Sequence, residues 1–139
     1  MNPILSAHIL LFQDNNVLLV KHGEAAEHIN GVYGIPGGRQ NLNESLKETA
    51  VREFAEETGL VIKENELIEF PDNSYTADIQ RKGGTTKRYT MMVFLGRSYQ
   101  GQLQSSSETT PEWISLEKIS ALNLLPNVEN AIQAAMKVE

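Results

Sequence analysis

The residues best suited to chemistry are three glutamates that follow an arginine within one short segment: Arg52, Glu53, Glu56 and Glu57. On a helix, residues three and four positions apart lie on the same face, so the three carboxylates are expected to converge. Carboxylates this close repel one another unless a cation lies among them. Their hard oxygen atoms suit Mg²⁺ or Mn²⁺ rather than zinc, so the segment predicts a divalent metal site. These residues alone leave open a solvated acidic helix face as the alternative.

A helix over residues 44–58 is predicted to carry these side chains. Apolar residues recur there at helical spacing and define a buried stripe: Leu46, Ala50 and Phe54. The segment 41–44 offers a capping box at the start of the helix. Gly59 lies where a left-handed residue would end it.

Strands are predicted before and after this helix, because β-rich runs alternate with turn residues. They cover residues 7–12, 16–22, 67–70, 73–80, 88–99 and 113–114, with one short strand and a tight loop within 31–38. A small helix is expected over 115–122, and Pro126 is expected in the first turn of a C-terminal helix. The apolar face of that last helix is predicted to hold Val128, Ile132, Ala135 and Met136. This order of elements predicts an α/β protein with a mixed sheet covered on both faces.

Composition limits the class of protein. The chain has 139 residues, of which 40% are apolar, so we expect one domain over residues 1–139. Its formal net charge of −6 argues against binding to polymeric nucleic acid, which attracts basic surfaces. An anionic substrate would therefore need positive charge from elsewhere, such as a bound divalent cation. The chain has no cysteine, which excludes disulfides and thiolate-bound zinc.

The N-terminal apolar run, residues 4–12, is too short to span a bilayer and contains His8. It also has no basic segment before it of the kind that precedes a signal sequence. We therefore expect a core strand here, no membrane partner and a cytoplasmic location.

The run from Gly38 to Leu60 resembles the signature of the Nudix hydrolases, Gx5Ex7REUxEExGU, where U is a bulky apolar residue. Every fixed position is filled: Gly38, Glu44, Arg52, Glu53, Phe54, Glu56, Glu57, Gly59 and Leu60. The resemblance covers nearly the whole chain in element order. It implies an α/β/α sandwich with a mixed β-sheet between helices.

The resemblance also implies roles for individual residues. In the family the matching arginine orients the next residue, so Arg52 is expected to orient Glu53, which is expected to act as the general base. Metal ligands are expected from Gly37, through its carbonyl oxygen, and from the three glutamates of the segment. Structural roles are expected for Gly38, Glu44 and Gly59. A surface ion pair of Arg52 with Glu48 stays open as an alternative or an addition.

Other candidates lie outside the motif. Glu108 is in a stretch before Trp113 that looks like the one carrying an additional metal-binding glutamate in MutT-type members. Lys21 and His22 end a predicted strand where such members place phosphate-binding residues, and Asn127 lies near where they bind the base. The alternatives are a surface histidine at the end of a strand for His22, polarity at the start of a helix for Asn127, and an exposed loop acid for Glu108.

The predicted function is metal-dependent hydrolysis of a pyrophosphate linkage, with Mg²⁺ as cofactor and Mn²⁺ as a possible substitute. The expected substrate is a nucleoside triphosphate, which would give a nucleoside monophosphate and pyrophosphate. Alternatives are an ADP-ribose, nucleotide-sugar or dinucleoside polyphosphate hydrolase, or a non-catalytic nucleotide-binding regulator. The partner is expected to be a small nucleotide, and the protein a monomer or a homodimer.

Overall fold

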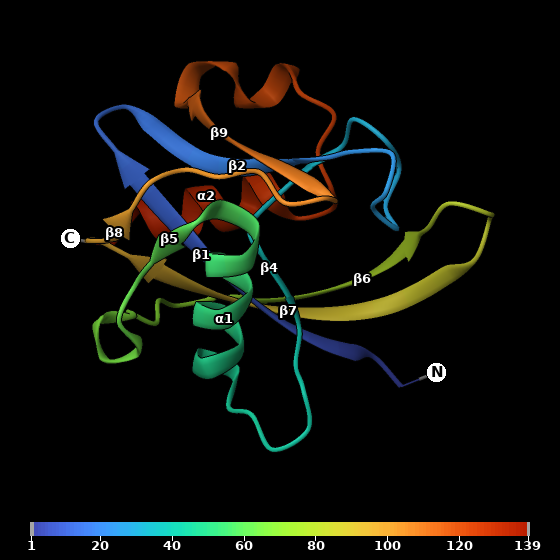
Figure 1. Ribbon diagram of the computed structural model, residues 1–139, viewed down its shortest axis with the longest axis horizontal. Helices are drawn as coiled ribbons and strands as arrows, with labels where there is room; N and C mark the ends of the chain where they lie inside the picture. The colour runs from blue at the N-terminus through green and yellow to red at the C-terminus, as the bar shows by residue number, and fades with distance from the viewer. Residues whose placement is uncertain (1, 139) are drawn as a thin grey trace.

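The computed structural model describes residues 2–138, which form a mixed β-sheet between two α-helices (Figure 1). In chain order the elements are β1 (Ile4–Gln13), β2 (Asn16–His22), β3 (Tyr33–Gly34), β4 (Gly37–Arg39), α1 (Leu46–Thr58), β5 (Leu60–Val61), η1 (Glu64–Glu66), β6 (Ser74–Gln80), β7 (Thr86–Gly96), β8 (Gln100–Gly101), β9 (Thr109–Ser115), η2 (Leu116–Ala121) and α2 (Val128–Met136). The predicted α/β class and the helix–sheet–helix layering are confirmed.

Strand β1 is the centre of the sheet. It runs parallel to β7 over eight residue pairs, from Ile4 with Tyr89 to Leu11 with Gly96. On its other side it pairs antiparallel with β4, and its last two residues form a hairpin with β2. The sheet order is β3-β2-β1-β7-β6, with β4 joined to β1 and β9 joined to β2. The predicted hairpin between the first two strands is therefore confirmed, but it is short because the two strands soon diverge to other partners.

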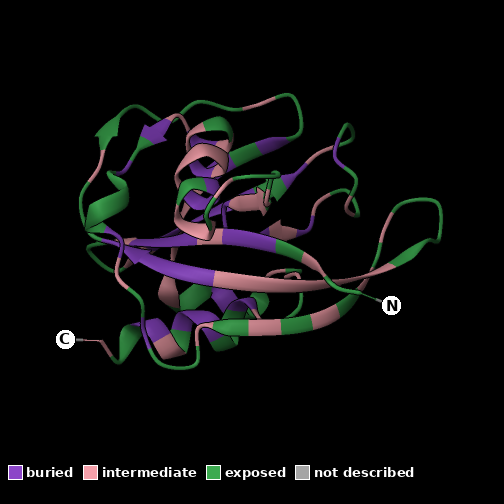
Figure 2. Cartoon of the chain, turned by 90° about the horizontal axis from the view of Figure 1, so that it is seen from below, coloured by how far each residue is buried: buried purple, intermediate pink, exposed green. Residues whose placement is uncertain are grey.

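Alternation along β1 builds the two hydrophobic layers. Ile9 and Leu11 pack with Ala50 and Phe54 of α1, whereas Leu10 packs with the apolar face of α2. Buried residues concentrate along the central strands and on the inner faces of the helices (Figure 2). The far part of the β6–β7 hairpin extends beyond this core and is largely exposed or half-buried.

Helix α1 begins two residues later than predicted. Ser45 is its N-cap and forms the capping box with Glu48, so the capping box predicted over residues 41–44 is wrong. Glu44 Oε1 does accept a hydrogen bond of 3.1 Å from the Asn41 N–H, but these residues form a turn before the helix rather than its first turn. Gly59 ends the helix with a φ of 81°, as predicted.

Three further predictions about the elements are wrong. Residues 67–70 form no strand; within them only Ile68 makes an isolated bridge, to Leu95. Pro126 lies before α2 rather than in its first turn, because Asn127 is the N-cap, in a left-handed conformation with a φ of 70°. Met136 is 55% exposed and so does not belong to the buried face of this helix. Within residues 2–138, no helix is long and apolar enough to cross a membrane.

Candidate active site

A cavity of about 300 Å³ lies where α1 and β4 meet the open face of the sheet. Two groups of residues line it from different directions. The carboxylate side consists of Gly37, Glu53, Glu57 and Glu108. The sheet side consists of Ser6, His8, Tyr75, Tyr89 and Met91, which come from β1, β6 and β7.

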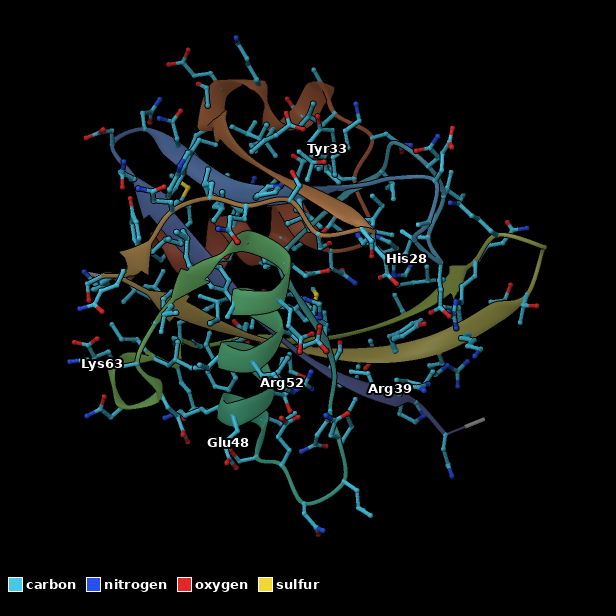
Figure 3. The ribbon with its side chains drawn as sticks, viewed as in Figure 1. His28, Tyr33, Arg39, Glu48, Arg52 and Lys63 are labelled. Atoms are coloured by element: carbon cyan, nitrogen blue, oxygen red, sulfur yellow. The ribbon has the colours of Figure 1, made fainter. Side chains whose placement is uncertain are left out.

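Arg52 organises the carboxylate side from the exposed flank of α1. Its Nε and Nη2 donate to the two carboxylate oxygens of Glu44 at 2.7 and 2.9 Å, and its Nη1 donates to Glu53 Oε1 at 2.7 Å. A further hydrogen bond, from Nη2 to the Arg39 carbonyl, joins the helix to β4. Arg52 and Arg39 are labelled in Figure 3. The hydrogen bonds that Arg52 donates to Glu44 lower the pKa of Glu44 to about 2. Glu48, the alternative partner of Arg52, binds Ser45 instead.

Glu57 is the most strongly perturbed acid of the site. Its Oε1 accepts a hydrogen bond of 2.8 Å from the Gly37 amide, which joins α1 to the start of β4. Burial raises the pKa of Glu57 to about 8, and the nearby charges of Glu53 and Glu108 act in the same direction. Burial also raises the pKa of Glu53, one helical turn earlier. Both carboxylates therefore lie where a negative charge lacks full compensation.

The third glutamate of the predicted trio lies elsewhere. Glu56 is 59% exposed at its side chain, contacts Arg52 at 3.4 Å, and does not line the cavity. The structure therefore brings Glu53 and Glu57 together but leaves Glu56 on the solvent side. Over residues 2–138, no three carboxylate or imidazole side chains are already close enough to hold a metal ion.

The donor set on the carboxylate side nevertheless fits a divalent cation. In an antiparallel pair of strands, residues that hydrogen-bond to the partner strand alternate with residues that do not. Pro36 is hydrogen-bonded to β1, so Gly37, the next residue, is in a position that makes no backbone hydrogen bond to β1. Its amide and carbonyl groups therefore face away from β1, and its N–H already binds Glu57. A backbone carbonyl beside two under-compensated carboxylates is an all-oxygen set of the kind that Mg²⁺ and Mn²⁺ prefer.

Gly38 allows the Glu53 carboxylate to approach the backbone. A Cβ atom at this position would lie 2.4 Å from the Glu53 carboxyl carbon and from its Oε2. Since Oε1 is bound by Arg52, this second oxygen is held against β4. The architectural role predicted for Gly38 has a specific contact in the structure.

Glu108 joins the carboxylate side from the loop before β9. Its backbone is fixed by Ser106 Oγ, which accepts from its N–H at 3.2 Å, and by Gly23, which donates to its carbonyl at 2.8 Å. Its charge affects the pKa values of both Glu57 and His28. Glu108 is therefore near Glu53 and Glu57 in space although it lies 51 positions after Glu57.

The three substrate-binding candidates separate in the structure. His22 and Asn127 line the cavity, and Lys21 does not. Alternation along β2 sends Lys21 to the other face, where its Nζ lies 5.9 Å from the centre of the Tyr33 ring. His22 is only 8% exposed, and burial lowers its pKa to about 4, so its imidazole is neutral at neutral pH.

The sequence did not identify several cavity residues, among them Ser6, His8, His28 and Arg39. His8 Nδ1 lies 2.8 Å from the Ile35 carbonyl oxygen, and its Nε2 lies 2.9 Å from Ser6 Oγ. Burial lowers the pKa of His8 to about 4. The available signal was two polar residues at alternate positions of an otherwise apolar strand, which places them on one face.

Comparison with known proteins identifies the family of this chain. The family model of the NUDIX domain matches residues 2–135. The chain is 28% identical over 129 residues to the Nudix hydrolase YvcI of Bacillus subtilis, covering 92% of this chain and 76% of that protein. It is 23% identical over 128 residues to the 8-oxo-dGTP diphosphatase of Escherichia coli, covering 88% of each.

A third relative is an ADP-ribose pyrophosphatase of Methanocaldococcus jannaschii, 32% identical over 68 residues, which are 49% of this chain and 39% of that protein. Among solved structures, a MutT protein from Methanosarcina mazei superposes with a TM-score of 0.76 at 28% identity and covers 97% of both chains. The family model, the named relatives and the fold thus define a pyrophosphohydrolase with an α/β/α architecture. The chain belongs to the Nudix hydrolase family. Members of this family generally use divalent cations and act on small nucleotide substrates.

Proposed function

We propose that the protein hydrolyses a nucleoside triphosphate to a nucleoside monophosphate and pyrophosphate, with Mg²⁺ as its cofactor and Mn²⁺ as a substitute. The observation that carries this proposal is the shared cavity: Glu53, Glu57, Glu108 and Gly37 face the same space of about 300 Å³ as the sheet side. That volume is at the lower end for small-molecule sites and suits one nucleoside unit with its phosphates. The relatives named for 8-oxo-dGTP hydrolysis support the same substrate class.

The roles of the residues follow from their contacts. Glu57, Glu53 and the Gly37 carbonyl would hold the cation, with Glu108 as a further ligand and Glu56 as an outer one that needs a change of side-chain conformation. When bound, a divalent cation supplies positive charge to the phosphate oxygens and makes water a stronger acid. Arg52 holds Glu53 Oε1, which leaves Oε2 free to take the proton from an attacking water molecule.

A panel of nucleotides assayed with Mg²⁺, with Mn²⁺ and with EDTA tests the proposal. The products are separated by ion-exchange chromatography and identified by ³¹P NMR. We expect a nucleoside monophosphate and pyrophosphate from at least one triphosphate, and no turnover in EDTA. AMP with ribose 5-phosphate from ADP-ribose, at higher kcat/KM than any triphosphate, would instead favour the activity for which the archaeal relative is named.

A further inference from the structure

Ser6 and His8 form a polar pair on the sheet side that the proposed hydrolysis does not use. They lie two residues apart on β1, so both side chains face the cavity. In the sheet Ser6 is paired with Met91 of β7, which in turn is paired with Tyr75 of β6. Ser6 is 5% exposed, so its hydroxyl group must be satisfied by the protein or by a ligand.

The hydrogen bonds of His8 fix which of its nitrogens carries the proton. Its Nδ1 lies 2.8 Å from the carbonyl oxygen of Ile35, and a carbonyl can only accept, so Nδ1 is the donor. A neutral imidazole protonated at Nδ1 has a lone pair at Nε2. Ser6 Oγ lies 2.9 Å from that Nε2, so the serine hydroxyl donates its single proton to His8.

Ser6 Oγ consequently has only lone pairs left to present to the cavity. The phosphate oxygens of an ionised nucleotide are also acceptors, so a contact between them and Ser6 Oγ would be repulsive. The group that fits Ser6 is an N–H or an O–H, and within a nucleotide those belong to the base and the sugar. Tyr75 and Met91 beside Ser6 provide apolar surface for a flat ring, which agrees with this side holding the nucleoside half.

We propose that Ser6, oriented by His8, accepts a hydrogen bond from an N–H or O–H group of the substrate's nucleoside half and so selects nucleotides that carry this donor. The inference rests on the proposed function, because it takes a nucleotide as the ligand. It adds a specificity-determining residue and the chemical type of group that this residue recognises. His8 is a positioning residue in this arrangement, since it acts through the orientation of the serine hydroxyl.

The test compares kcat/KM for pairs of nucleotides that differ by one donor. GTP against ITP and ATP against purine riboside triphosphate remove an amino group from the base, whereas GTP against dGTP removes a sugar hydroxyl. We expect the wild type to favour the donor-bearing member of one pair by roughly tenfold, as for a lost partner of a buried polar group. Ser6→Ala should bring that ratio close to one through KM, with kcat nearly unchanged. Ser120→Ala, at an exposed site on η2, is the matched control and should keep the wild-type ratio.

The pair that responds identifies whether the donor belongs to the base or the sugar. If the kcat/KM ratios of an active Ser6→Ala enzyme stay within twofold of the wild-type ratios, Ser6 does not select the substrate. The proposed hydrolysis would still stand. No turnover of any nucleotide by the wild type would overturn the proposed function and the selection with it. A ¹⁵N NMR spectrum of the wild-type imidazoles gives an independent readout that does not depend on how a variant folds. A proton at Nδ1 of His8 is expected, and a proton at Nε2 would contradict the proposal.

Discussion

The two sides of the cavity are built in different ways. The carboxylate side is mostly local: Gly37, Glu53 and Glu57 come from one strand and the next helix, and Arg52 joins them within the same segment. The sheet side is assembled from three strands that are distant in sequence, and its polar pair is neutral. Charge is therefore concentrated where a phosphate chain and a cation would lie, and neutral groups lie where a nucleoside would lie.

This difference predicts two classes of variant. Changes on the carboxylate side should lower kcat for every substrate, since the cation and the base serve any pyrophosphate linkage. Changes on the sheet side should alter KM and the ratio between substrates, since those residues would contact only the nucleoside half. The Ser6→Ala measurement belongs to the second class, and the following changes belong mainly to the first.

The largest effect is expected from Glu57→Gln. The amide keeps the size of the side chain but removes a ligand charge, so kcat should fall by about 10³-fold or more for all nucleotides. The variant should remain folded, because a neutral group relieves the burial of charge that raises the pKa of Glu57 to about 8. Steady-state kinetics with circular dichroism checks both expectations. Glu64→Gln, at an exposed position of η1, is the control and should behave as the wild type.

Substitutions at two adjacent glycines should separate catalysis from folding. The three heavy atoms nearest to a Cβ at Gly38 all belong to the Glu53 side chain, the closest at 2.4 Å, so Gly38→Ala should displace that carboxylate. We expect a loss of roughly 10- to 100-fold in kcat with little change in thermal stability. A Cβ at Gly37 would lie 2.2 Å from the Ala7 carbonyl oxygen, which cannot move away alone. Gly37→Ala should therefore destabilise the fold itself, by about 2 kcal/mol or more. Equal melting temperatures for the two variants would contradict this contrast.

The pH dependence of stability tests the charge on the carboxylate side. The folded protein raises the pKa of Glu57 from 4.5 to about 8, so it binds a proton more readily than the unfolded chain does. The contribution of Glu57 to the free energy of unfolding is fully present below about pH 4.5 and is lost as the pH rises through 8. His8 and His22 have the opposite sign, because their pKa values fall from 6.5 to about 4 and their contribution is lost on acidification across that interval.

The Glu57 contribution can be isolated by comparing the wild type with Glu57→Gln in urea unfolding at pH 5 and pH 8.5. In EDTA the wild type should lose stability relative to the variant as the pH rises. Saturating Mg²⁺ should reverse that loss for the wild type, by about 2–3 kcal/mol at 100 times the dissociation constant. A Mg²⁺ effect of equal size in the variant would show that Glu57 does not contribute to cation binding.

The smallest effect is expected at Asn127, the N-cap of α2, which lines the cavity. Its backbone has a φ of 70°, which glycine also adopts readily, so Asn127→Gly removes the side chain without backbone strain. We expect KM to rise by roughly three- to tenfold with kcat unchanged, as for one lost hydrogen bond. Lys21→Ala should leave KM unchanged, because Lys21 faces away from the cavity. A larger rise in KM for Lys21→Ala than for Asn127→Gly would show that Lys21, and not Asn127, contacts the substrate.

The placement of Glu53 and Glu57 on one face could be predicted from the sequence, because the two residues are four positions apart on one helix. Helical spacing could not show that Glu56 faces solvent, because all three glutamates lie on the same broad side of the helix. The position of β4 against the helix decides which of them are buried. The capping box was misplaced because two overlapping segments fit its pattern: residues 41–44 form a turn with the Asn41–Glu44 hydrogen bond, and Ser45 with Glu48 caps the helix.

The sheet side could not be predicted, because it depends on strand pairing over long distances. Ser6 faces the cavity only as a result of the parallel pairing of β1 with β7, some 85 positions later. The partner that fixes the His8 tautomer is 27 residues away. For Lys21 and His22 the sequence contained a usable constraint, since adjacent strand residues face opposite sides and only one of them could line the cavity.

In the proposed mechanism, α1 and β4 together hold a divalent cation against a phosphoanhydride. A crystal structure with Mg²⁺ and a nucleoside triphosphate analogue that carries a methylene bridge between its α- and β-phosphorus atoms tests this most directly. We predict Mg²⁺ bound by Glu53, Glu57 and the Gly37 carbonyl, in contact with the phosphate chain, and the base against the sheet side. Mg²⁺ bound elsewhere, or a phosphate chain directed away from Glu53 and Glu57, would contradict the account.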